Sequence, residues 1–140
     1  MVARLRSAVA PQSLIPVALV VLLALGGVWL WHVMGRPTPL PAAEVRSELS
    51  GHTAGGRWPH GAHYLLYFAP EGAAVYREPE KAVIEGSWRV ADDGILCLSF
   101  PSQAEICYGV AREAGSLVWI QSGSGRTFSF SVAEGRDPAL

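Results

Sequence analysis

The chain has 140 residues, enough for one domain of ordinary size, and a formal net charge of −1 with histidine neutral. The charge is unevenly placed. Residues 1–36 carry three arginines and no acidic residue, whereas residues 37–140 carry eight basic and twelve acidic residues, a net charge of −4. A mildly acidic body lacks the concentrated basic face that contact with a phosphate backbone requires, so we expect no nucleic-acid partner.

The N-terminal part has the pattern of a membrane span. Ser7–Gly35 contains no Asp, Glu, Lys or Arg. Its densest apolar part, Leu14–Met34, is long enough to cross a hydrocarbon core of about 30 Å as a helix. Arg4 and Arg6 precede this stretch, so the positive-inside rule predicts a cytoplasmic N-terminus and a body on the outer side. We therefore expect Leu14–Met34 to hold the chain in a membrane.

A cleaved signal segment is the competing interpretation of the same residues. Signal peptides have an apolar core of about 7–15 residues followed by a cleavage site of small residues. Here the apolar run is longer, and the best candidate site, Pro41-Ala42-Ala43, has proline where a small residue is expected. We favour residues 1–35 as an anchor that is not cleaved.

The rest of the chain divides into a linker and one domain. Residues 36–41 hold three prolines and are predicted to form an extended, Pro-rich linker. Ala42–Leu49 follows as a predicted short helix, because its apolar residues share one face and Gly51 comes next as a stop. Residues 42–140 then form one β-rich domain, which the predicted topology places outside the cytoplasm.

After the short helix, turn residues recur about every 8–12 positions, the spacing typical of an antiparallel β-barrel or sandwich. No strand–helix alternation suggests a parallel sheet. We therefore predict a mainly β fold of seven or eight strands with one short helix. The expected strands are Gly51–Trp58, His63–Ala69, Ala73–Arg77, Ala82–Val90, Ile95–Phe100, Glu105–Arg112, Leu117–Gln121 and Thr127–Val132.

The two cysteines lie in a predicted hairpin whose register can be counted. A two-residue turn at Asp93-Gly94 would pair Val90 with Cys97 and place Trp88 on the same face as Cys97. The next loop would then set Cys97 directly opposite Cys107, close enough for a disulfide. A redox pair is the weaker alternative, because catalytic dithiols usually sit as Cys-x-x-Cys at a helix start.

An ordered set of glycines, aromatic residues and cysteines resembles a family of small, uncharacterised bacterial secreted or periplasmic domains, over roughly residues 44–120. The resemblance implies a compact β-rich domain outside the cytoplasm and no established activity. The chain departs from the family pattern in its apolar N-terminal stretch and in His60 and His63. The matching residues are Leu49-Ser-Gly51 with Thr53, Tyr67-Phe68-Ala-Pro70-Glu-Gly72, Gly86-Ser-Trp88-Arg-Val90, Leu96-Cys97 and Cys107-Tyr108.

Three histidines are weak candidates for metal ligands. His60 and His63 are three residues apart, and His52 is close in sequence. Zinc or copper would need further ligands in place, and no cysteine pair or carboxylate cluster adjoins these histidines. We therefore predict no metal site and no cofactor.

The aromatic residues divide into expected core and expected ligand-lining groups. In a domain of this size most aromatic side chains fill the core, and a ligand cavity is the less common outcome. The expected structural core comprises Gly86, Trp88, Tyr67, Phe68 and Tyr108. The side chains that could line a ligand cavity are Trp58, Tyr64 and Trp119.

The sequence carries no recognisable catalytic set: Asp92-Asp93-Gly94 reads as a turn, and Gly123-Ser124-Gly125 lacks the spacing of a nucleophile elbow or phosphate loop. We therefore expect a non-catalytic module that binds a small ligand or interacts with a protein partner. We expect it to be anchored in the bacterial inner membrane with its domain in the periplasm. The alternative is an accessory subunit of a membrane complex, docked through its transmembrane helix. An enzyme is the third hypothesis.

Overall fold

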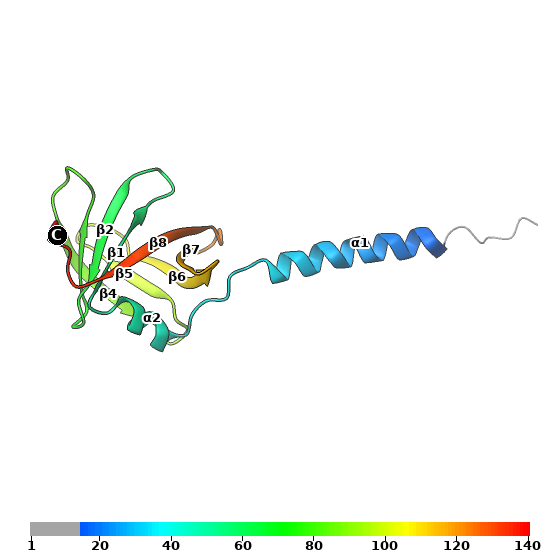
Figure 1. Cartoon of the computed structure of the whole chain (residues 1–140), viewed down its shortest axis with the longest axis horizontal. Coiled ribbons are helices and arrows are strands. Elements are labelled where there is room, and N and C mark those ends of the chain that lie inside the picture. The colour runs from blue at the N-terminus through cyan, green and yellow to red at the C-terminus, as the bar shows by residue number, and fades with distance from the viewer. Residues whose placement is uncertain (1–14) are drawn as a thin grey trace, which may run out of the picture. The chain divides into compact units, whose positions relative to one another are not determined.

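The computed structural model describes residues 15–140 (Figure 1). The chain separates into two units, Met1–Arg36 and Pro37–Leu140, each with its own contacts. In the first unit, α1 runs Ile15–Met34, and the side chains of residues 20–30 are exposed. The predicted span starts at Leu14, and this residue, like Arg4 and Arg6, lies outside the described residues. Within residues 15–140, no helix combines the length and apolarity that crossing a membrane demands.

The second unit is a closed antiparallel barrel in which each strand pairs with the next along the chain, and β1 pairs with β8 (Figure 1). The prediction of a mainly β fold with seven or eight strands is confirmed, and the barrel is the correct alternative. The strands are β1 His52–Arg57, β2 His63–Phe68, β3 Ala73–Arg77, β4 Ile84–Val90, β5 Leu96–Ser99, β6 Ile106–Glu113, β7 Ser116–Gln121 and β8 Thr127–Glu134.

Each strand turns alternate residues toward the inside of the barrel, as the pleat of a β-strand requires. In β2 the buried residues are Tyr64, Leu66 and Phe68. Tyr67 lies between two of them, so it faces outward and is only half-buried, which corrects its assignment to the core. The other predicted core side chains, Trp88 and Tyr108, pack against the buried cluster from partly buried positions.

One end of the barrel is closed by α2, Ala42–Leu49, where the sequence predicted a helix. Val45 and Leu49 point into the core with no exposed surface, and the Arg46 Nη2 donates a 2.8 Å hydrogen bond to the carbonyl oxygen of Val90. The predicted linker is partly built into the domain. Leu40 packs against the core, and its backbone N–H donates a 2.7 Å hydrogen bond to the carbonyl of Val110.

The turn between β4 and β5 has three residues, not two, and this corrects the predicted register. The N–H of Ala91 and the carbonyl of Ile95 are bonded at 2.8 Å, and Gly94 has a φ of +86°, the left-handed conformation that such a turn needs at its last position. The register moves by one residue, so Arg89 lies opposite Cys97. Trp88 therefore points inward, on the opposite face from Cys97.

The disulfide prediction is confirmed. Cys97 and Cys107 lie directly opposite each other on β5 and β6, and their sulfur atoms are bonded. The bond lies on the outer face of the barrel, because the inward-facing neighbours of Cys97 are Leu96 and Leu98. It therefore holds two neighbouring strands together without using space in the core.

Candidate ligand-binding site

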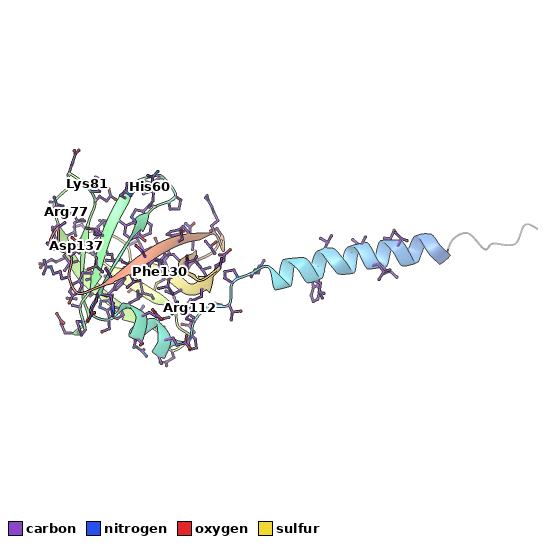
Figure 2. The ribbon with its side chains drawn as sticks, viewed as in Figure 1. His60, Arg77, Lys81, Arg112, Phe130 and Asp137 are labelled. Atoms are coloured by element: carbon purple, nitrogen blue, oxygen red, sulfur yellow. A yellow bond between two sulfur atoms is a disulfide. The ribbon has the colours of Figure 1, made fainter. Side chains whose placement is uncertain are left out.

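At the end of the barrel opposite α2, the hairpin loops surround an open cavity of about 520 Å³, which we call the cup. Figure 2 shows two of its side chains, His60 and Lys81, projecting at this end. The strands supply its apolar wall and the loops supply its polar rim. The wall is formed by Trp58, Tyr76, Ile84, Leu98, Phe100, Ile106, Tyr108 and Phe128, and the rim by Pro59, His60, Glu78, Lys81, Ala82, Gln103, Gln121 and Arg126.

The bottom of the cup is closed by Trp58, which is partly buried and packs on the buried core residue Tyr64. The rings of Trp58 and Tyr64 are stacked with 4.0 Å between centroids, and Tyr64 is only 2% exposed. Below the stack, the Trp119 Nε1–H donates a 2.7 Å hydrogen bond to the Tyr64 Oη. The cavity is therefore a blind cup rather than a channel through the barrel, because aromatic side chains and α2 fill the other half.

Of the three side chains predicted to line a cavity, only Trp58 does so. Tyr64 and Trp119 belong to the core beneath it. Tyr108, predicted as core, also lines the wall. Sequence reasoning missed the remaining wall residues. The loop residues of the rim gave no pattern from which they could have been found.

A chain of hydrogen bonds links the wall to the rim. The Trp58 Nε1–H donates to the Tyr76 Oη at 2.8 Å, and the Tyr76 hydroxyl donates to a Glu78 carboxylate oxygen at 2.7 Å. The other oxygen of Glu78 forms an ion pair with Lys81. Hydrogen bonds from Lys81 and Tyr76 hold the pKa of Glu78 below its usual range, so the carboxylate is ionised at neutral pH. Burial and the bond to Glu78 raise the pKa of Tyr76, which stays a neutral donor.

The charged residues of the rim differ in whether they already have an ion-pair partner. Glu78 already accepts hydrogen bonds from Tyr76 and Lys81. Arg126 lies exposed on the loop between β7 and β8, and the salt bridges formed within residues 15–140 do not include it. The cup therefore has one acid, which is neutralised by Lys81, and one arginine whose charge is available.

The three candidate histidines do not form a common ligand set. His52 bonds through Nδ1 to the carbonyl oxygen of Ser50 at 2.8 Å, and His63 bonds through Nε2 to Arg57 at 2.8 Å. His60 is at the rim of the cup, and no group of three metal-capable side chains in the described residues includes a histidine. The structure thus assigns local roles to two of these residues and a place beside the cavity to the third.

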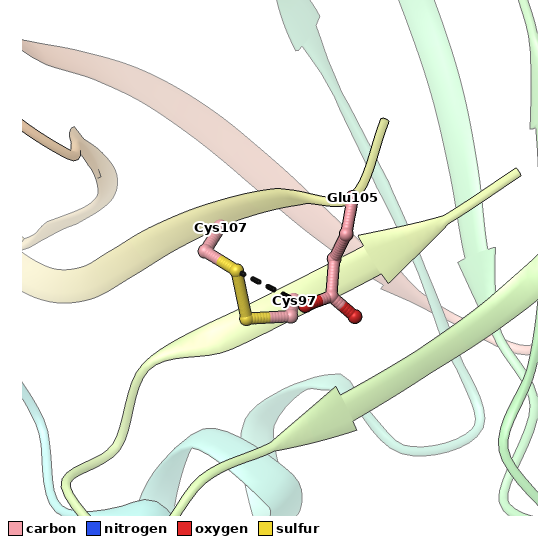
Figure 3. Close-up of side chains that lie close together, drawn as sticks. All are labelled: Cys97, Glu105 and Cys107. Atoms are coloured by element: carbon pink, nitrogen blue, oxygen red, sulfur yellow. Dashed lines mark hydrogen bonds between the residues drawn. A yellow bond between two sulfur atoms is a disulfide. The ribbon is translucent and has the colours of Figure 1, made fainter. Parts of the chain in front are cut away.

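One group of metal-capable side chains occurs in the described part of the chain: Cys97, Glu105 and Cys107 (Figure 3). Its two sulfur atoms are bonded to each other, which removes them as thiolate ligands. The Glu105 carboxylate approaches the Cys107 sulfur at 3.9 Å, but a disulfide sulfur carries no proton, so this is a contact and not a hydrogen bond. The partner of Glu105 is Arg89, at 2.8 Å. The cluster is therefore structural.

Comparison with known proteins gives one family. A search of curated proteins finds no match. Residues 18–134 match the family described as "Protein of unknown function (DUF995)". The match spans most of the chain and includes all eight strands of the barrel. It agrees with the resemblance to an uncharacterised family that the sequence suggested. The chain therefore belongs to the family of proteins of unknown function DUF995.

Proposed function

We propose that the domain is a non-catalytic binding module that holds an apolar small molecule in the cup. The observation that carries the proposal is the wall: eight aromatic or aliphatic side chains surround a cavity of about 520 Å³ that is open at one end. Ligand sites are typically concave, mostly apolar and about 300–1,000 Å³ in volume, with a few polar groups that fix orientation. The cup has these properties.

Binding is favoured over catalysis by where the histidine, acidic and basic side chains of the cup lie. His60, Lys81 and Arg126 are on loops, and Glu78 directly follows the end of β3, so all four are at the rim and not along the wall. Glu78 is held ionised by its partners, which does not suit it to donate a proton. A bound molecule would therefore meet rings and alkyl groups along most of its length.

The test is titration of the fragment 37–140 with Nile red, a neutral apolar dye. This fragment contains the whole barrel, α2, the core and the disulfide. We expect saturable binding at one dye per chain. Ile84→Trp fills the cup and should abolish binding, whereas Val83→Trp adds the same bulk at an exposed neighbouring position outside the lining. Circular dichroism checks that both variants fold. Binding that survives Ile84→Trp, or no saturable binding at all, contradicts the proposal.

We further propose that the module is anchored in the bacterial inner membrane by residues 1–35, with the barrel in the periplasm. The support is the uncharged apolar run of the sequence that follows Arg4 and Arg6. The disulfide on the outer face agrees with an oxidising compartment. A small molecule in the periplasm is then the expected ligand, and the accessory-subunit hypothesis is the second candidate because apolar side chains of α1 are exposed.

A further inference from the structure

The charges and the shape of the cup together restrict what kind of molecule fits. Among the lining residues the one carboxylate, Glu78, is occupied by Lys81 and Tyr76, while Arg126 has no ion-pair partner within residues 15–140. A cationic group at the rim would meet Lys81 and Arg126 and find no free acid. An anionic group would gain Arg126, and the uncharged amides of Gln103 and Gln121 also line the cavity.

The wall favours a flexible chain over a flat ring system. Trp58 already stacks on Tyr64 and also meets Tyr108 and Phe128, so its ring is engaged by other rings of the protein. An alkyl chain gains from burial against ring edges and aliphatic groups alike and needs no free ring face. Ile106 lines the cup and is 42% exposed, so the apolar wall continues up to the mouth.

We propose that the ligand is a single-chain amphiphile with an anionic head, bound tail first, with its head beside Arg126. This inference rests on the proposed function, because it names the ligand class of the same cup. Trp58, stacked on the core residue Tyr64, closes the bottom of the cup, so a ligand can enter only from the open end, and the polar rim is where the head remains partly hydrated. A free carboxylate and a phosphate monoester share the required chemistry.

The experiment uses the full chain in nanodiscs of neutral phosphatidylcholine. A dodecanoate with a diazirine near the end of its tail is bound, irradiated and mapped by mass spectrometry of peptides. We expect labels on peptides that contain wall residues such as Trp58, Leu98 and Phe128. Non-photoreactive dodecanoate and dodecyl phosphate then compete, and the comparison between them separates carboxylate from phosphate. Dodecanol should compete about tenfold more weakly, and dodecyltrimethylammonium more weakly still.

Arg126→Gln should weaken competition by dodecanoate about tenfold and leave competition by dodecanol unchanged, because only the anion loses its partner. The matched control is Arg136→Gln, which removes an exposed arginine outside the cup and should change neither. Labels in the cup with equal competition by all head groups, or no effect of Arg126→Gln, would overturn the inference while the cup remains a binding site. Absence of label from the cup peptides would overturn the proposed function as well.

Discussion

The indole N–H of Trp119 and the phenol oxygen of Tyr64 are joined by a 2.7 Å hydrogen bond in the middle of the barrel, where the two residues are 1% and 2% exposed. Water does not reach either group, so each depends on the other as its polar partner. The same Tyr64 ring carries the stacked Trp58 on the cup side. The pair therefore supports the floor of the binding cavity as well as the core.

Tyr64→Phe should destabilise the domain by about 1–3 kcal/mol at neutral pH, because the Trp119 N–H is left buried without an acceptor. Urea unfolding of the fragment 37–140 measures the difference. Tyr67→Phe is the matched control, since Tyr67 faces outward and is half-buried, and it should cost much less.

The same residue predicts a loss of stability in alkaline solution. Burial raises the pKa of Tyr64 to about 12 from its ordinary value of about 10. Because the pKa of Tyr64 is raised in the folded state, protonated Tyr64 contributes fully to the free energy of unfolding below about pH 10. This contribution is lost as the pH rises from about 10 to about 12, and the loss is at most about 3 kcal/mol. The stability advantage of the native chain over Tyr64→Phe should shrink across this range. An advantage that stays constant would contradict the assigned pKa.

Replacing both Cys97 and Cys107 by alanine should lower the melting temperature by several degrees without abolishing the fold. The closed loop is short, with the cysteines ten positions apart, so chain-entropy models limit the stabilisation to about 3 kcal/mol. Calorimetry on the oxidised and doubly substituted domains gives the difference. Mass spectrometry of the non-reduced chain gives the direct check, in which two free thiols or a disulfide-linked dimer would disprove the pairing.

Gly86→Ala should destabilise the domain more than an alanine substitution at another strand glycine does. A Cβ at this position would lie 2.2 Å from the carbonyl oxygen of Ser99 and 2.6 Å from a ring carbon of Phe100, so the backbone of β5 would have to move. Overpacking of this kind costs about 1–3 kcal/mol. Gly55→Ala is the control, because its nearest neighbour would be a Leu65 methyl group at 3.4 Å, an ordinary contact. Equal unfolding midpoints for the two variants would refute the prediction.

A reporter that is active only after export, fused behind Leu140, should be active in a bacterial host, and the mature chain should keep its N-terminus. Export follows from the charge asymmetry around Leu14–Met34, and the retained N-terminus follows from an apolar run longer than a signal-peptide core. Intact mass spectrometry of the membrane fraction gives the second readout. A silent reporter would disprove the topology, whereas a mature chain that begins near Glu44 would show cleavage.

The strands and α2 could be predicted because they rest on local features: alternation of apolar residues, aromatic and β-branched content, and turn residues at short intervals. The side of the barrel toward which Trp88 points could not be predicted, because Asp93-Gly94 fits both a two-residue and a three-residue turn. In the structure the longer turn packs against Leu40, which is a contact that the local sequence does not reveal. Gly94 lies so close to the Leu40 carbonyl that an added Cβ would be 2.4 Å from its oxygen.

The cup was harder to predict than the fold, since depth inside a barrel depends on how distant strands are staggered. Trp58, Tyr64 and Trp119 look alike as ligand-lining candidates in the sequence. Which of them reaches the opening depends on the register of β1 with β2 and β8 and of β7 with β6 and β8. Arg126 lies in a glycine- and serine-rich loop that gives no indication of its position at the rim.

Closure of the barrel also has a consequence for folding and association. The ladder between β1 and β8 joins residues as distant in sequence as His52 and Glu134, whereas every other ladder joins neighbouring strands. This late, non-local step is the slowest kind of contact to form. Until it does, β1 and β8 present unpaired backbone groups that another chain can extend. Substitutions that weaken β8 should therefore promote aggregation during refolding, before any loss of equilibrium stability becomes measurable.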